Sequence, residues 1–484
     1  MMGSAAPFGG LQDVLQVYLR AARTPPTFSS GPVPGGAVGK QYPGAPRVFL
    51  PTPSPRPRLQ TTCDLRQLSD LLALSFGVSR LRHSPGSVAR SAPGLLRAVA
   101  SGGALYPSEL YLLHRGIAGL EDGLSHYDPI HHQLERLRSE RSDGPSQESA
   151  GQLWLLLTSA TWKTAYKYQA FSYRPLTLEL GLLAEQVRTV GTVLGARCSA
   201  HPFPEAANDL LALTEGELPG MLLGLHWLPD REVERAATAG TFLRRLRLSA
   251  ATGGTGQPCP GVPTLRDFPA AWHLQQAAAL HSHSGDTGLP PPMAAAGGIT
   301  PLVRAMRSRR SCSQGFRAAP VPGGQLREVL QCSSGIDGVE LLLVARKVIG
   351  LAPGTYRYDM NLRELLPTGI GHDSANLGPL LRGGAADNVE QSSHPAAWVY
   401  PVVTLLPADQ GRAGDYRRAQ ISAGRMLQRL QLACTLQGVD SHISLAYDVA
   451  VVQRGFDLNE LEYPAAQMLL GRALPSTEGL EVRL

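Results

Sequence analysis

The sequence predicts an α+β protein built from two tandem copies of one unit. Strand-like and helix-like segments follow one another without a regular strand–helix–strand rhythm, which favours α+β over a doubly wound sheet. The two halves of the chain share a pattern of residues, and a Gly/Pro-rich stretch separates them. At 484 residues the chain is also too long for one ordinary core, so two domains are expected.

Composition divides the chain into four parts. Residues 1–60 are rich in Pro, Gly and Ser after one short helical stretch, and they form a loop-rich N-terminal extension. The first unit occupies residues 61–250 and the second unit residues 301–484. Residues 251–300 connect them; this stretch is Gly/Pro-rich apart from the helical segment AAWHLQQAAALHSH, and such a composition buries little apolar surface.

The hydrophobic pattern of the first unit predicts a helix, a loop, two strands joined by a turn, a third strand and a long helix. The runs ELYLL, from Glu109, and WLLLTSA, from Trp154, are typical of buried strands. The last helix is expected from about Tyr168 to Leu194, because apolar residues recur there at helical spacing.

The two halves repeat one another in order and in spacing. QLSDLL, from Gln67, corresponds to QLREVL, from Gln325, and each is followed by an apolar strand that opens with a glutamate, Glu109 or Glu340. The later matches are Gly123 with Gly354, Tyr127-Asp128 with Tyr358-Asp359, Tyr173-Arg174 with Tyr416-Arg417, Gly181 with Gly424, and Gly195 with Gly438. Three equal spacings in one order indicate a duplicated unit.

The segment SGGALYP directly precedes the ELYLL strand. Glycines in such a place let the backbone approach a flat ligand closely and leave N–H groups for its polar edge. A lone Gly-Gly would be interpreted as an ordinary turn, but the whole heptapeptide in front of Glu-Leu-Tyr is more specific. The candidate ligand-binding residues are Ser101, Gly102, Gly103, Ala104, Leu105 and Tyr106.

A second motif, Lys167-Tyr168, lies in WKTAYKYQAFSYR. Alone it could be a solvated lysine beside a core aromatic. Together with SGGALYP it resembles the SagB-type dehydrogenases of the nitroreductase superfamily, also called the cyanobactin-oxidase-like group, which oxidise thiazoline and oxazoline rings of ribosomal peptides to thiazoles and oxazoles. The resemblance implies a nitroreductase-like fold, an FMN lined by SGGALYP, and catalytic roles for Lys167 and Tyr168. Leu182 stands where members often have His.

An arginine-rich motif near the start of the second unit resembles the Arg-Ser-x-Arg-x-Phe pattern with which nitroreductase-like proteins bind the FMN phosphate, although Cys312 replaces the aromatic residue. Guanidinium groups suit a phosphate because they stay charged and donate two hydrogen bonds at once. A basic helix face in solvent is the alternative. The resemblance implies phosphate contacts from Arg307, Ser308, Arg309, Arg310 and, near the C-terminus, Arg472.

These motifs are divided between the halves. The first half lacks the arginine motif, and the second half lacks SGGALYP and has Gln410 and Gly411 at the Lys-Tyr positions. In the superfamily that the chain resembles, FMN lies at a dimer interface. The resemblance therefore implies an intramolecular pseudo-dimer with one complete FMN site built from both halves, and one degenerate site in a degenerate second half. It is strong over about residues 60–228 and weak over 300–475.

Converting an azoline to an azole removes a proton from one ring carbon and a hydride from its neighbour, so the protein must supply a base while the flavin takes the hydride. An ammonium group beside a phenol lowers its pKa, which makes Tyr168 the expected base and Lys167 its electrostatic partner. The reverse assignment stays open. Adjacent residues point about 100° apart on a helix, so both can face one ring only at a helix start or an irregular turn.

Two other functions remain open on sequence alone. One is an NAD(P)H-dependent nitroreductase-type reduction of small molecules, and the other is a non-catalytic scaffold subunit that binds a peptide. For the dehydrogenase, the expected partners are a modified peptide substrate and a cyclodehydratase of the same pathway. Further oligomerisation of the pseudo-dimer is not decided.

Composition argues against several other classes. The net charge of +6 comes from scattered basic residues, which does not indicate a nucleic-acid partner. The six cysteines form no CxxC pair and no Cys/His cluster with zinc spacing, so no metal site is expected. No apolar run approaches the roughly 20 residues of a membrane span, and MMGSAAPFGG is not a signal peptide. A cytoplasmic protein is therefore expected.

Overall fold

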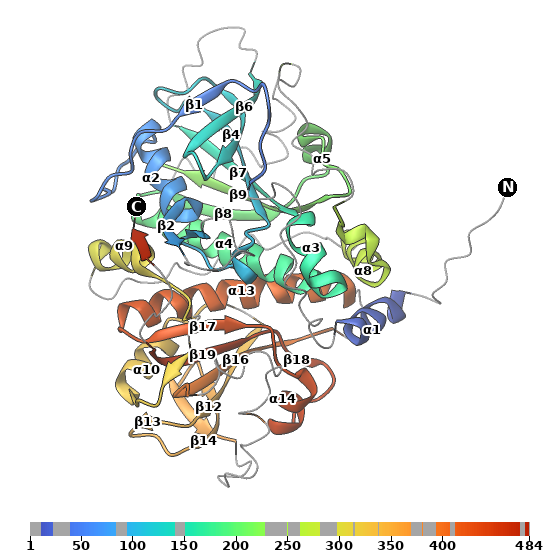
Figure 1. Ribbon diagram of the computed structural model, residues 1–484, viewed down its shortest axis with the longest axis vertical. Coiled ribbons are helices and arrows are strands. Elements are labelled where there is room, and N and C mark those ends of the chain that lie inside the picture. Colours follow the sequence, from blue (N-terminus) through green and yellow to red (C-terminus); the bar gives the residue numbers. More distant parts are fainter. Residues whose placement is uncertain are drawn as a thin grey trace, which may run out of the picture.

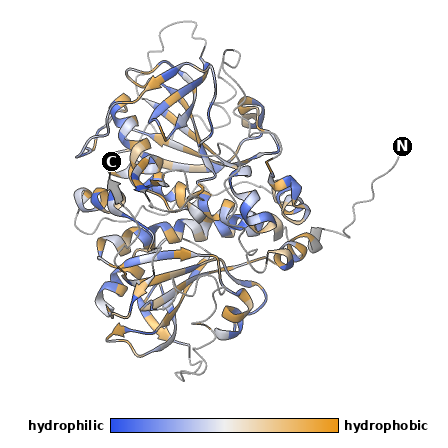
Figure 2. Ribbon diagram, viewed as in Figure 1, coloured by the Kyte–Doolittle hydropathy of each residue, from blue (hydrophilic) through white to orange (hydrophobic). Residues whose placement is uncertain are grey.

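The structure is a computed structural model in which two sheets lie on either side of a layer of central helices (Figure 1). Hydrophobic residues are found on the strands of both sheets and on the central helices (Figure 2). Most of the buried apolar side chains form one cluster that runs through both halves, from Leu15 to Leu470, and a smaller cluster lies in the first half. The structure describes residues 11–22, 39–83, 94–140, 151–227, 249, 262–280, 298–312, 315–336, 338–368, 380, 394–406, 412–474 and 480–483.

The first half forms a seven-stranded antiparallel sheet with the order β1-β6-β5-β4-β7-β9-β8. Nearly every residue of β4, β5 and β7 is buried, which accounts for the apolar runs in their sequences. The strands are β1 (Arg47–Phe49), β4 (Ser108–Arg115), β5 (Gly123–Asp128), β6 (Gln133–Ser139), β7 (Gln152–Ala160), β8 (Arg197–Pro202) and β9 (Glu217–His226).

Helices cover this sheet, and the longest of them lies against the second half. The long helix begins at Tyr173 and not near Tyr168, because the chain breaks at Gln169, whose φ is 51°. Pro175 then fits the first turn of this helix, where no N–H is needed. The helical elements are α2 (Leu65–Phe76), α3 (Trp162–Tyr168), the 3-10 turn η3 (Gln169–Ser172), α4 (Tyr173–Val193) and α5 (Ala206–Leu211).

The second half repeats this topology. Its strands run β15-β14-β12-β16-β19-β17, which matches β6-β5-β4-β7-β9-β8 position by position. The strands are β10 (Phe316–Arg317), β11 (Val321–Pro322), β12 (Val339–Ala345), β13 (Val348–Ile349), β14 (Gly354–Asp359), β15 (Glu364–Pro367), β16 (Ala397–Thr404), β17 (Asp440–Ser444), β18 (Glu462–Pro464) and β19 (Gln467–Ala473). The helices are α9 (Ile299–Ser308), α10 (Gly323–Gln331), α13 (Arg412–Leu436) and α14 (Val449–Gly455). The tandem fold predicted from the repeat is confirmed.

The two halves meet through α4 and α13, which pack along most of their length (Figure 1). The repeated glycines lie at the crossing: Gly181 faces the backbone of Ile421, and Gly424 faces the backbone of Leu178. The spacing that relates Gly181 to Gly424 also relates Leu178 to Ile421. Each half therefore makes the same contact with the other half, as in a two-fold symmetric dimer. The repeated tyrosines Tyr173 and Tyr416 stack with ring centroids 6.5 Å apart. The chain therefore forms an intramolecular pseudo-dimer.

The repeated arginines also act across this interface. Arg174 donates to the hydroxyl of Tyr447 and the carbonyl of Ala465 in the second half, each at 3.2 Å. Arg417 donates to the carbonyls of Pro219 and Gly220 in the first half. Each half thus supplies one arginine that satisfies backbone oxygens of the other, which explains why the Tyr-Arg pair occurs twice in the sequence.

An alanine at the helix crossing should destabilise the protein strongly. The added methyl of Gly424→Ala would collide with the backbone oxygen of Leu178, so the helices must separate. Overpacking of this kind costs about 1–3 kcal/mol or more. Gly324→Ala is the matched control, because that helical glycine has nothing within 4 Å among the residues that the structure describes and should gain up to about 1 kcal/mol of helix propensity. Urea unfolding measures both, and equal stabilities would contradict this account of the interface.

Several segments depart from the boundaries predicted by composition. Strand β1, placed in the N-terminal extension by composition, pairs with β6. The helical segment expected in the connection is helix α8 (Pro269–Leu280), and it packs on α13 and on α1 (Leu11–Ala21), the short helix expected near the N-terminus. The C-terminal strand β20 (Leu480–Arg483) crosses to the first half and pairs with β2 (Val78–His83), which also pairs with β3 (Gly94–Arg97). Pro/Gly content cannot show such pairing, because it depends on distant strands.

Two further sequence-based expectations concern membrane-spanning helices and the second-half counterparts of the Lys-Tyr pair. Within the described ranges, no helix combines the length and the apolar composition that a bilayer crossing requires. Gln410 and Gly411, the second-half counterparts of the Lys-Tyr pair, lie outside the described residues.

Candidate active site

The segment SGGALYP forms an irregular loop between β3 and β4. Its residues Gly102–Ala104 make a single 3-10 turn, and the backbone has positive φ at Gly103 (65°), Ala104 (56°) and Tyr106 (48°). Such angles are uncommon for residues with a side chain and are typical of functional loops. Gly103 and Ala104 are exposed, whereas Tyr106 is buried. The loop therefore presents bare backbone to the outside while a buried tyrosine anchors it.

Sheet pairing brings the two sequence motifs together. The glycine loop ends where β4 begins, and the Lys-Tyr motif follows the end of β7. Because β4 and β7 are antiparallel, with Ser108 opposite Ser159, the start of one strand lies beside the end of the other. The loop before β4 and helix α3 after β7 are therefore neighbours, although they are far apart in the sequence.

Lys167 and Tyr168 converge on the glycine loop. A methyl group built on Gly103 would lie 2.8 Å from Lys167 Nζ and 2.9 Å from Tyr168 Oη. Adjacent residues can do this because α3 ends at Tyr168, and the next residue, Gln169, has φ 51° and ψ −135°. The irregular turn that the sequence argument required is thus present, at the end of a helix.

A third polar group, which the sequence motifs did not identify, completes the cluster. The carboxylate of Glu179, on α4, accepts a hydrogen bond of 2.8 Å from the N–H of Gly102. Burial raises the pKa of Glu179 to about 8, because the charged form loses its hydration. Burial, and then the nearby Glu179, also raise the pKa of Tyr168. The net pKa of Tyr168 is therefore raised and not lowered, and the phenol is protonated near neutral pH.

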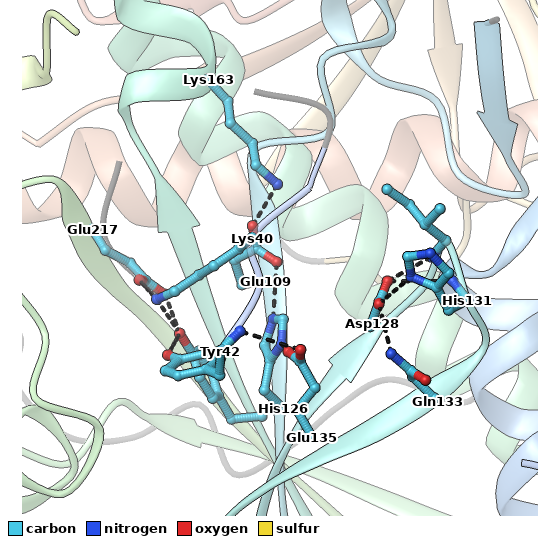
Figure 3. Close-up of polar contacts among 12 residues, drawn as sticks. Lys40, Tyr42, Glu109, His126, Asp128, His131, Gln133, Glu135, Lys163 and Glu217 are labelled. Atoms are coloured by element: carbon cyan, nitrogen blue, oxygen red, sulfur yellow. Dashed lines mark hydrogen bonds and ion pairs between the residues drawn. The ribbon is translucent and has the colours of Figure 1, made fainter. Parts of the chain in front are cut away.

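A buried charged network holds the loop and α3 in place (Figure 3). Lys163, one turn before Lys167, donates to the carboxylate of Glu109 at 2.5 Å and to the carbonyl of Tyr106 at 3.4 Å. Burial opposes ionisation of Glu109, but Lys163 and His126 outweigh it and lower its pKa to about 2. Lys163 thus joins helix α3, the glycine loop and strand β4.

The same face of the sheet carries further buried ion pairs. His126 lies between Glu109 (3.2 Å) and Glu135 (2.9 Å), and these hydrogen bonds overcome burial and raise its pKa. Lys40, from the N-terminal segment, pairs with Glu217 of β9 (Figure 3). Three cations therefore balance three carboxylates when His126 is protonated, so the network is electrically neutral as required for buried charges.

The structure divides the predicted phosphate-binding arginines. Arg309 is buried and crosses to the first half, where it donates to the carbonyls of Ala98 (2.6 Å) and Arg97 (3.3 Å), just before the glycine loop. Arg307 instead donates to the backbone of Ser54 and Pro55, and Arg310 is exposed. Of the three arginines, Arg309 is the one that the structure brings to the loop.

The remaining predicted contacts of the second half are local. The hydroxyl of Ser308 donates to the carbonyl of Arg304, within its own helix. Arg472 donates to the carbonyl of Gly438 and to Gln325, so it links β19 to the end of α13 and to α10. The described contacts do not bring either side chain to the glycine loop.

A further buried arginine, Arg97, lies beside the loop and was missed by the sequence motifs. Its guanidinium is 4.1 Å from the ring centroid of Phe76 and 4.6 Å from that of Tyr106. Its Nε and Nη1 have no hydrogen-bond partner among the described residues. An unsatisfied buried guanidinium is costly, so this pair of donors fits an anionic ligand. The Arg at the start of RAVASGGALYP was the available signal.

Comparisons with known proteins agree with this architecture. The Nitroreductase family model matches residues 306–472. The "putative nitroreductase MJ1384" of Methanocaldococcus jannaschii is 26% identical over 156 residues, which are 31% of this chain and 73% of that protein. The family model thus matches the half in which the resemblance to SagB-type dehydrogenases is weak.

Among solved structures, a "putative nitroreductase" from Anabaena variabilis covers 95% of this chain and 99% of its own, with a TM-score of 0.71 and 22% identity. That match spans both halves and shows the fold. The E. coli microcin synthetase McbBCD complex with truncated pro-MccB17 covers 45% of this chain and 85% of its own at 15% identity, but its TM-score of 0.31 is too low for an inference.

The fold and the comparisons define a nitroreductase-like protein with two tandem copies of the fold. The Nitroreductase family model matches most of its second half.

Proposed function

We propose that the chain is an FMN-dependent dehydrogenase that oxidises thiazoline or oxazoline rings to thiazoles or oxazoles in a ribosomally made peptide. The observation that supports it most is the convergence of Lys167 and Tyr168 on Gly103. The two motifs that resemble SagB-type dehydrogenases form one site, although either could have been an ordinary turn or a surface pair.

The residues present fit FMN. The exposed backbone at Gly103 and Ala104 suits the flat ring, and the unsatisfied guanidinium of Arg97 suits the phosphate, with Arg309 beside it from the second half. Arg97 and Arg309 replace Arg307 and Arg310 as the proposed phosphate ligands. When bound, the flavin supplies the acceptor for the hydride.

The chain's own residues handle the proton. Tyr168 is the proposed catalytic group, since its hydroxyl faces the glycine loop, and Lys167 supplies a positive charge beside it. Together they suit the removal of an acidic ring proton next to a flat acceptor. The modified peptide and a cyclodehydratase that forms the azoline are the proposed partners.

The two alternatives use the same fold differently. A nitroreductase needs the flavin site but has no need of a cluster of Lys167, Tyr168 and Glu179 beside it, which favours the dehydrogenase. A scaffold without flavin would have no use for the unsatisfied donors of Arg97 beside a bare glycine loop.

The flavin content of the purified chain tests the proposal first. We expect close to one FMN per chain, because the motifs form one complete site. A ratio near two would contradict the single site, and a ratio near zero would contradict the flavoenzyme. Incubation with an azoline peptide should then remove two hydrogen atoms per ring by mass spectrometry, whereas reduction by NADPH alone would favour the nitroreductase.

A further inference from the structure

Glu179 is a buried carboxyl group that the proposed chemistry has not yet used. It lies on an otherwise apolar stretch of α4 and is 5% exposed. Its hydrogen bonds come from the N–H of Gly102 and the hydroxyl of Ser101, both in the glycine loop. Among the described residues it forms no ion pair, and Arg97 is the charged group whose effect on its pKa opposes burial.

Tyr168 lies near both Glu179 and Lys167 at the glycine loop. A methyl group built on Gly102 would lie 3.4 Å from Glu179 Oε1 and 3.6 Å from Tyr168 Oη. On Gly103 the neighbours are instead Tyr168 Oη and Lys167 Nζ. The phenol oxygen therefore adjoins both glycines. At Gly102 its neighbour is the Glu179 carboxylate, and at Gly103 its neighbour is the Lys167 ammonium group.

We propose that Glu179 is the terminal proton acceptor of this site and receives, through Tyr168, the proton that the substrate releases. The C–H bond of one ring carbon breaks and its proton goes to the Tyr168 oxygen, while the Tyr168 O–H proton passes to the Glu179 carboxylate. The neighbouring carbon gives its hydride to the oxidised flavin, and the ring gains one double bond. Because Glu179 acts through Tyr168, it is a positioning residue.

This route explains how a protonated phenol can serve a deprotonation. Burial raises the pKa of Tyr168, so the phenol cannot act as a base unless its own proton leaves at the same time. Burial also raises the pKa of Glu179 to about 8, against the opposing effect of Arg97. The groups facing the carboxyl are Ser101, Tyr168 and Arg97. Since the carboxylate is the accepting form, turnover should rise with pH through about 8.

The proposal rests on the proposed function and is tested with the full chain, loaded with FMN. In the unaltered protein we expect the rate on an azoline peptide to fall below pH 8. Glu179→Gln should retain flavin and lose at least tenfold in turnover. Its pH–rate profile should also lose the acidic limb, which is the fall in rate below pH 8. Ser422→Ala is the matched control, since Ser422 stands at the equivalent position of α13 by the spacing that relates Gly181 to Gly424. It should leave rate and pH profile unchanged.

A second measurement needs no substrate. The folded pKa of about 8 lies above the ordinary value of 4.5, so the carboxyl favours folding below pH 4.5 and this contribution is lost as pH rises to 8. The melting temperature of Glu179→Gln minus that of the unaltered chain should therefore increase as the pH is raised from about 5 to about 8, roughly the interval between the ordinary and the folded pKa. A constant difference would overturn the proposal.

The outcomes separate the two proposals. No turnover by the unaltered chain overturns the proposed function and with it the proton route. Normal turnover combined with an unchanged acidic limb in Glu179→Gln overturns the proton route alone. If Glu179→Gln fails to fold, Glu179→Asp replaces it, and an acidic limb that does not move in that variant also counts against the route.

Discussion

Tyr168→Phe should keep the fold and the flavin but lose about 10²–10⁴-fold in turnover, the usual contribution of a proton-transfer group. The substitution removes only the hydroxyl, which lies 2.9 Å from the methyl position of Gly103, and keeps the ring packed beside Phe171. Steady-state rates on an azoline peptide, with flavin content and melting temperature measured in parallel, separate loss of chemistry from loss of structure.

The neighbouring tyrosine provides the control for this variant. Tyr166 lies on the same helix but is only partly buried, and Tyr166→Phe should turn over normally. Normal turnover by Tyr168→Phe would remove the phenol from the mechanism and leave Lys167 as the remaining candidate base. Lys167→Met should also lose activity, because it removes the positive charge beside the phenol.

The tandem fold could be predicted from the sequence because its repeat preserves the residues that the interface needs. Gly181 and Gly424 recur because two helix backbones touch there, and Arg174 and Arg417 recur because each satisfies carbonyls of the other half. Such contacts tolerate few residue types. The Lys-Tyr pair and SGGALYP could also be recognised from the sequence as two motifs. The antiparallel pairing of β4 with β7, which brings them together, is visible only in the structure.

The arginine assignment could not be made from spacing alone. Helical periodicity would place Arg307 and Arg310 on one face, but α9 ends at Ser308 and Arg309 is already extended, with φ −54° and ψ 128°. The change of backbone direction turns Arg309 inward and leaves Arg310 exposed. Glu179 was not predicted as a site residue for a different reason: its place beside the glycine loop is set by packing of α4 against a segment that is distant in the sequence.

Removing the guanidinium of Arg97 should weaken FMN binding, whereas the variant without FMN should be at least as stable as the unaltered protein without FMN. In Arg97→Met an apolar side chain takes the place of the guanidinium between Phe76 and Tyr106, and two unsatisfied buried donors disappear. A hydrogen bond to a charged group contributes about 1.5–3 kcal/mol, so affinity should fall about tenfold or more. Opposite signs in apo stability and in affinity are what a ligand-binding role predicts and a structural role does not.

Fluorescence titration of the apo protein with FMN measures this loss, and urea unfolding without FMN measures the stability. Arg310→Ala is the matched control, since that side chain is exposed and should bind FMN normally. The affinity of the unaltered protein should also fall with added salt if a phosphate meets Arg97 and Arg309. Unchanged affinity in Arg97→Met, together with a loss in Arg310→Ala, would place the phosphate at the exposed arginines of the sequence motif, and the buried guanidinium would then need another anion.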